Sequence, residues 1–222
     1  MPARNATCAV IGAGDFIGAA IAKKFAAEGY AVFAGRRSAE KLAPLKAEIE
    51  AAGGMCFARA LDARKEDDIT AFLSEADAHA PLEVVIANPG ANVNFPILDT
   101  TERVFFKVWE MACKAGFLTG REAARIMLKH GRGSIFFTGA TASVRGGSGY
   151  AAFASAKAGL RMVAQSMARE LGPWNITVNT FIPGVTKTEV ERPSVSEEKF
   201  KGYVAMQCLK RMSTPDDMAK VV

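Results

Sequence analysis

Residues 7–18 read TCAVIGAGDFIG, an apolar run that passes into a glycine-rich loop. Thr7–Gly12 is β-prone and Phe16–Glu28 has the apolar spacing of a helix, so the segment predicts a strand, a tight turn and a helix. Glycines let backbone N–H groups approach a pyrophosphate, and the helix N-terminus adds partial positive charge. The spacing is one residue longer than the dinucleotide fingerprint, and similar turns occur in ordinary connections. We predict that this loop binds cofactor phosphates, through Gly12, Gly14, Phe16, Ile17 and Gly18.

Apolar runs and amphipathic stretches alternate along the rest of the chain. Further strands are predicted at Tyr30–Ala34, Met55–Leu61, Leu82–Ala87, Ser134–Thr138 and Ile176–Ile182. Helices are predicted from an N-cap at Ser38 to Ala52, at Glu66–His79, at Thr101–Lys129 with a kink near Ala115-Gly116, and at Ala151–Leu171. This alternation predicts an α/β fold, a doubly wound parallel sheet of about six strands with helices on both faces.

The composition is that of an ordinary globular protein. The chain has 222 residues, of which 50% are hydrophobic and 23% charged, and a net charge of +5 with acids and bases interleaved. That pattern does not suggest a nucleic-acid partner. Its four cysteines are scattered and its two histidines lie in polar helix ends, so zinc hydrolase and Ser-His-Asp chemistry are poorly supported. No apolar run approaches the ~20 residues of a membrane span, and we expect a cytoplasmic protein.

Two arginines follow the second predicted strand, in the segment Ala34-Gly35-Arg36-Arg37. An NAD site needs an acidic residue here for the ribose 2′-hydroxyl, and none is present. The planar guanidinium groups of Arg36 and Arg37 suit the 2′-phosphate of NADP instead. The alternative is that both arginines are solvated residues at the start of the next helix. We expect NADP(H) in preference to NAD(H).

The glycine loop and several later segments resemble the short-chain dehydrogenase/reductase family over roughly residues 7 to 190. Gly12 and Gly18 match the first and third glycines of the family's Thr-Gly-x-x-x-Gly-x-Gly loop. Ile11 stands in place of the threonine and Phe16 in place of the second glycine. A bulky side chain at Phe16 restricts the approach of the backbone to a cofactor, and Gly14 restores some room.

The resemblance also assigns cofactor residues beyond the loop and the arginines. Asp62 matches the residue that holds the adenine, and Thr188 the one that bonds the nicotinamide carboxamide. Asp15 lies where NADP-binding members often carry a base, and its carboxylate would repel a 2′-phosphate. The residues assigned in this way are Asp62, Asn88, Gly90, Lys157, Pro183, Gly184 and Thr188.

The segment Phe153-Ala154-Ser155-Ala156-Lys157 resembles the family's Tyr-x-x-x-Lys motif without the phenol hydroxyl. Family members transfer hydride between the nicotinamide and a carbonyl or alcohol, with the tyrosine as proton carrier and the lysine on the ribose. Lys157 matches the lysine, and Phe153 stands at the tyrosine position. The family's serine and asparagine positions fall at Ala140 and Ala112. Loss of a general acid typically costs about 10²–10⁴-fold in rate.

Two neighbours are candidate substitutes for the missing groups. Tyr150 lies seven residues before Lys157, which is nearly the same helix face but ~10 Å along the axis. Thr141 replaces the serine if the strand end shifts by one residue. The alternative is that Tyr150 packs at the helix start.

The resemblance implies one Rossmann-type domain over residues 1–222, without the family's seventh strand. It implies a homodimer or homotetramer that packs through the small residues around Lys157, unless these pack within the chain. It also implies a small carbonyl or alcohol substrate. Two functions remain open: a weak or atypical oxidoreductase, or a catalytically silent NADP(H)-binding regulatory or scaffold protein.

Two segments are expected to shape the substrate site. Thr186–Gln207 lacks clean periodicity and is either a lid or an ordinary surface loop with a short helix. Val93–Leu98 carries the apolar residues Val93, Phe95, Ile97 and Leu98, which indicate either an apolar ligand or core packing.

Overall fold

The computed structural model describes residues 2–186 and 197–222, and one parallel sheet runs through the middle of the fold. Its strand order is β3-β2-β1-β4-β5-β6. This order is the doubly wound Rossmann-type arrangement and confirms the predicted fold class. The strands are β1 (Thr7–Ile11), β2 (Ala31–Arg36), β3 (Met55–Ala60), β4 (Leu82–Ala87), β5 (Gly133–Thr138) and β6 (Ile176–Phe181).

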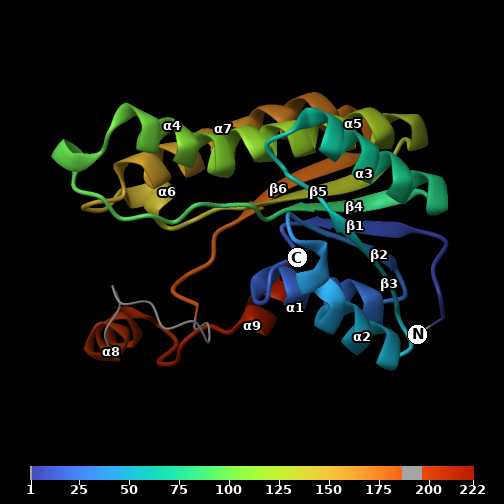
Figure 1. The fold of residues 1–222 in the computed structure, drawn as a ribbon, viewed down its shortest axis with the longest axis horizontal. Helices are drawn as coiled ribbons and strands as arrows, with labels where there is room; N and C mark the ends of the chain where they lie inside the picture. Colours follow the sequence, from blue (N-terminus) through green and yellow to red (C-terminus); the bar gives the residue numbers. More distant parts are fainter. Residues whose placement is uncertain (1, 187–196) are drawn as a thin grey trace.

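Helices cover both faces of the sheet, as predicted, and Figure 1 shows the two layers. One layer holds α3 (Glu66–His79), α4 (Glu102–Trp109), α5 (Ala115–His130) and α7 (Ala151–Leu171). The other holds α1 (Ile17–Ala27), α2 (Ala43–Ala51) and α9 (Pro215–Ala219). The short helix α6 (Ala142–Arg145) and α8 (Glu197–Met206) lie at one end of the sheet. Among the described residues, no helix is long and apolar enough to cross a membrane.

The central strands are buried on both faces, which explains their unbroken apolar sequences. In β1 every residue is buried. Side chains alternate across a strand, so Ala9 and Ile11 join the core under α3, α5 and α7. Cys8 and Val10 join the core under α1 and α2.

The helix predicted from Ser38 to Ala52 is wrong in its first turn. Residues Ala39–Leu42 form a 3₁₀ turn, α2 begins at Ala43, and the Ser38 side chain makes no capping hydrogen bond. Pro44 is the physical reason, because a proline is tolerated in the first turn of an α-helix but not in its interior.

The long helix predicted at Thr101–Lys129 is interrupted, close to the predicted kink. A π-helical turn at Glu110–Lys114 separates α4 from α5. Such turns insert one extra residue and often lie at functional sites. The turn places Ala112 and Cys113 in the core.

The small residues of α7 pack largely within the chain. Ala152 and Ala156 are buried in the core. A Cβ on Gly159 would lie 3.3 Å from the Cys113 sulfur, so this glycine lets the π-helical turn approach α7 closely. Ala154 and Ala158 are half-buried. Packing within the chain therefore accounts for the small residues on one side of α7.

Candidate active site

The strand order reverses between β1 and β4, and the loops that follow these two strands meet there. The Asn88 side chain donates a hydrogen bond to the Gly12 carbonyl oxygen at 2.9 Å and accepts one from the Thr138 hydroxyl at 2.8 Å. Asn88 thus joins the loops after β1, β4 and β5. In doubly wound sheets this crevice beyond the carboxyl ends of the strands is where ligands bind.

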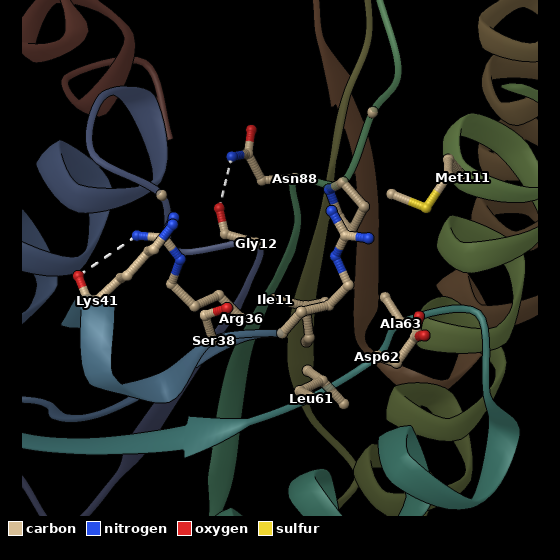
Figure 2. A pocket seen from close by; sticks show the side chains of 14 residues that line it. Ile11, Gly12, Arg36, Ser38, Lys41, Leu61, Asp62, Ala63, Asn88 and Met111 are labelled. Atoms are coloured by element: carbon tan, nitrogen blue, oxygen red, sulfur yellow. Dashed lines mark hydrogen bonds between the residues drawn. The ribbon is translucent and has the colours of Figure 1, made fainter.

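A pocket of about 340 Å³ opens at this crevice. Figure 2 shows Arg36, Ser38 and Lys41 on one side of it and Asp62, Ala63 and Met111 on the other. The lining residues are Ile11, Gly12, Gly14, Arg36, Arg37, Ser38, Lys41, Leu61, Asp62, Ala63, Asn88, Pro89, Gly90 and Met111. Seven of the residues assigned to the cofactor by sequence therefore come together: Gly12, Gly14, Arg36, Arg37, Asp62, Asn88 and Gly90.

The glycine loop is held tightly at one glycine and is open at another. A Cβ on Gly18 would lie 2.5 Å from the Gly12 carbonyl oxygen and 2.9 Å from the Ala13 Cα, so the helix could not approach the loop with any side chain there. A Cβ on Gly14 would meet nothing within 4 Å. Phe16 is the N-cap of α1 and half-buried, and it does not line the pocket. Ile17 and Gly18 also lie outside the lining.

The two arginines differ in their partners. One Arg36 terminal nitrogen donates to the Asp15 carboxylate at 2.9 Å and to the Lys41 carbonyl oxygen at 3.4 Å. Arg37 is exposed. Among the described residues, neither Arg37 nor Lys41 forms an ion pair within 4 Å. The pocket therefore has a cationic end in which one cation is already paired.

Asp62 is also paired before any ligand binds. Arg64 donates to both carboxylate oxygens of Asp62, at 2.9 and 2.6 Å. These hydrogen bonds lower the Asp62 pKa to about 2, so the carboxylate is charged at neutral pH. An ionised carboxylate can accept further hydrogen bonds, and Asp62 stays available to a donor such as an exocyclic amine.

Lys157 is a buried cation held by backbone oxygens. Its amine donates to the Thr138 carbonyl oxygen at 2.7 Å and to the Pro89 carbonyl oxygen at 3.1 Å. Burial lowers its pKa to about 8. A Cβ on Gly90 would lie 3.6 Å from the amine, so the glycine keeps the way between Lys157 and the pocket open.

The residues at the predicted tyrosine, asparagine and serine positions carry no titratable side chain. Phe153 is buried in the core at 9% exposure, and Ala112 is buried at the π-helical turn. Ala140 is half-buried beyond β5. Thr141 is exposed at the N-cap of α6, and β5 ends at Thr138 as predicted.

Tyr150 is fixed at the start of α7. It is the N-cap residue, its backbone N–H donates to the Gly147 carbonyl oxygen at 3.1 Å, and its ring packs against the core. The preceding loop is tied down as well, because the Phe95 N–H donates to the Gly149 carbonyl oxygen at 2.9 Å. The glycines before Tyr150 therefore form an anchored turn.

Two further assigned residues do not line the pocket. Pro183 and Gly184 follow β6 and do not line it. Thr188 lies outside the described residues, as does part of the expected lid. In the Val93–Leu98 segment the core-packing alternative is wrong for Phe95, Ile97 and Leu98, which are 41%, 67% and 95% exposed.

Sequence reasoning missed several residues of the pocket. Ser38 and Lys41 follow the second strand closely. The basic side chain of Lys41, five residues after Arg36, could have been predicted to join the same anion site. Met111 lines the pocket because it precedes Ala112 in the π-helical turn. Arg64 was missed although it is two residues from Asp62.

The arrangement suits an elongated anionic ligand with an adenosine end. Arg37 and Lys41 offer positive charge, Gly12 and Gly14 offer open backbone, and Asp62 offers an acceptor at the far side. Among the described residues, no group of three His, Cys, Asp or Glu side chains could hold a metal ion. The combination of positive charge, open loop backbone and a carboxylate acceptor fits a dinucleotide.

Several known proteins are similar to this chain in both sequence and fold. The family model described as short chain dehydrogenase matches residues 6–199. The 3-oxoacyl-[acyl-carrier-protein] reductase MabA of Mycobacterium bovis is 30% identical, over 96% of this chain and 82% of its own length. A solved short-chain dehydrogenase from Rhodopseudomonas palustris is 64% identical with a TM-score of 0.83, over 98% of this chain and 90% of its own. A 7α-hydroxysteroid dehydrogenase solved with NADH and 7-oxo glycochenodeoxycholic acid has a TM-score of 0.91 at 27% identity, over 97% and 85%.

Proposed function

Since the chain belongs to the short-chain dehydrogenase family, whose members are NAD(P)-dependent oxidoreductases, we propose that it transfers hydride between NADP(H) and a small carbonyl or alcohol substrate. The observation that carries the proposal is the pocket at the β1–β4 switch point. It joins the glycine loop, the cationic pair Arg37 and Lys41, and the carboxylate of Asp62. We also propose that the turnover is weak or atypical.

The cofactor choice rests on charge. Arg36 at the end of β2 and the following Arg37 and Lys41 line the pocket, where Asp15 is paired with Arg36 and Asp62 with Arg64. A 2′-phosphate carries about two negative charges at neutral pH and suits such a cluster. We therefore favour NADP(H) over NAD(H).

The proposed chemistry is limited by the proton carrier. A bound nicotinamide supplies or accepts the hydride. Lys157 lies next to Gly90, which lines the pocket, and its amine would hold the ribose. Its lowered pKa of about 8 also makes this amine a proton donor near neutral pH. Phe153 cannot transfer a proton, so the proton comes from Lys157, from Tyr150 or from water.

A second candidate function is a catalytically silent NADP(H)-binding protein with a regulatory or scaffold role. The observation in its favour is the coincidence of Phe153, Ala140 and Ala112 at the family's tyrosine, serine and asparagine positions. The cofactor pocket would be shared by both functions. Turnover of a carbonyl substrate separates them.

We further propose a cytoplasmic homodimer or homotetramer. Phe106 on α4, Trp109 at its end and Met162 on α7 are 59%, 39% and 45% exposed, and these two helices, which pack together, offer apolar surface for a subunit contact. Light scattering of the purified protein measures the subunit number, and a monomer at micromolar concentration would contradict this assembly.

The test of the function is a fluorescence titration of the purified protein with NADPH and, in parallel, NADH. We expect tighter binding of NADPH, followed by measurable reduction in a screen of carbonyl substrates. Tighter binding of NADH would contradict the cofactor choice. No binding of either cofactor would contradict the enzyme and the cofactor-binding alternative alike.

A further inference from the structure

We propose that Asp15 weakens the preference of this chain for NADP(H) by pairing with Arg36, so that the adenosine 2′-phosphate competes with one carboxylate for the Arg36 guanidinium. The proposal rests on the proposed binding of a nicotinamide cofactor. It identifies Asp15 as a specificity-determining residue that acts through Arg36.

The ion pair lies at the edge of the cofactor pocket, which Arg36 lines and Asp15 does not. Asp15 follows Gly14 in the glycine loop, and Arg36 ends the neighbouring strand β2. One terminal nitrogen of Arg36 lies 2.9 Å from an Asp15 carboxylate oxygen and 3.4 Å from the Lys41 carbonyl oxygen. The same nitrogen therefore donates to two acceptors and has no hydrogen directed at a third.

The two partners are exposed to very different degrees. The Asp15 side chain is 67% exposed and the Arg36 side chain 21%. Water can solvate the Asp15 carboxylate fully when the pair opens, whereas Arg36 stays at the pocket wall. An exposed ion pair of this kind contributes little net free energy, so a phosphate can compete for Arg36.

The neighbouring charges leave Asp15 as the acid that pairs with Arg36. Asp62, across the pocket, is held by Arg64. Glu48, on α2 near the loop, is paired with Lys23 at 3.1 Å. Among the described residues, Arg37 and Lys41 make no ion pair and would receive the phosphate first. Arg36 is thus a third cation whose use depends on Asp15.

Removing the Asp15 charge should therefore change one cofactor and spare the other. In Asp15→Asn the amide keeps the size of the side chain but no longer neutralises Arg36. We expect the Kd of NADPH to fall about five-fold at low ionic strength, the scale of an exposed ion pair. NADH lacks the 2′-phosphate, and its Kd should change by less than about two-fold.

The matched control is Glu28→Gln. Glu28 caps the far end of the same helix, α1, and pairs with Lys24 at 2.8 Å. The substitution removes an equal charge and an ion pair on the same helix, at a carboxylate that is 30% exposed and lies outside the pocket lining. It should leave both Kd values unchanged, which separates a local effect from a change in net charge.

A double-mutant cycle with Arg36→Gln tests whether Asp15 acts through Arg36. The gain from Asp15→Asn should shrink to less than about two-fold when Arg36 is absent. A gain of the same size in both backgrounds would show direct repulsion of the phosphate by Asp15 and would overturn the proposal. An unchanged NADPH Kd in Asp15→Asn would overturn it as well. If the unmodified protein binds neither cofactor, the proposed function fails instead.

Discussion

At the scale of single residues, Phe153 decides what the site can do. It is buried at 9% exposure beside Lys157 in the same helix, where a hydroxyl would be needed to carry a proton. Phe153 is not among the residues that line the pocket proposed for the cofactor. Binding and proton transfer are therefore separable in this chain.

We predict that Phe153→Tyr raises the turnover number for an accepted carbonyl substrate. The added hydroxyl supplies the missing general acid, and such groups contribute about 10²–10⁴-fold. Steady-state kinetics with NADPH measures the effect. Phe153→Leu is the control, since it changes the packing without adding a hydroxyl. No gain with tyrosine would show that the substrate geometry is absent too.

Lys157 predicts a pH dependence of stability. Burial lowers its pKa from 10.5 to about 8 in the folded protein. Between these values the unfolded chain binds a proton that the folded chain has released, so the free energy of unfolding rises with pH across this window. The burial cost is fully present below pH 8.

We predict that urea unfolding from pH 7.5 to 10.5 shows this rise in the unmodified protein and not in Lys157→Met. The difference between the two proteins should change by about 3 kcal/mol across the window. Comparing the two cancels the titration of other groups. Parallel curves would show that the buried amine keeps an ordinary pKa.

At the scale of elements, the glycine loop is the most constrained connection of the pocket. A Cβ on Gly18 would clash with the Gly12 carbonyl oxygen and the Ala13 Cα, which are backbone atoms that cannot rotate away. Gly14 faces open space. The two glycines therefore have different physical roles: one allows packing of α1 against the loop, and the other leaves room for a ligand.

We predict that Gly18→Ala destabilises the protein by about 1–3 kcal/mol, because overpacking displaces the loop or α1. It should also weaken NADPH binding, since the loop backbone moves. Gly14→Ala is the matched control and should leave the unfolding free energy within about 0.5 kcal/mol. Urea unfolding of both variants measures the difference, and equal effects would contradict the assigned packing role.

Element boundaries show what a sequence pattern can predict. The helix at Glu66–His79, the strand at Leu82–Ala87 and the helix at Ala151–Leu171 have the predicted bounds. Their periodicity is uninterrupted and their ends carry clear signals. The 3₁₀ turn before α2 and the π-helical turn at Glu110–Lys114 were not predicted, because they depend on local hydrogen bonding that apolar spacing does not encode.

At the scale of the whole molecule, the strand order could be predicted because right-handed crossovers leave few arrangements of alternating strands and helices. The meeting of Gly12, Asn88 and Arg36 at one crevice follows from that order. The choice of ion-pair partner could not be predicted. Asp15 pairs with Arg36 only once the end of β2 and the loop after β1 are brought together, whereas Asp62 pairs with Arg64 two residues along the same loop.

Lys157 also links two segments of the fold through its side chain. Its amine closes hydrogen bonds to the backbone after β4, at Pro89, and at the end of β5, at Thr138. Without it the buried hydrogen bond to the Thr138 carbonyl oxygen would be lost, at a cost of about 1–3 kcal/mol if that oxygen finds no other donor. A protein that has lost catalysis would therefore still need Lys157 for its stability. The presence of Lys157 beside Phe153 is thus expected both for an active enzyme and for a catalytically silent protein.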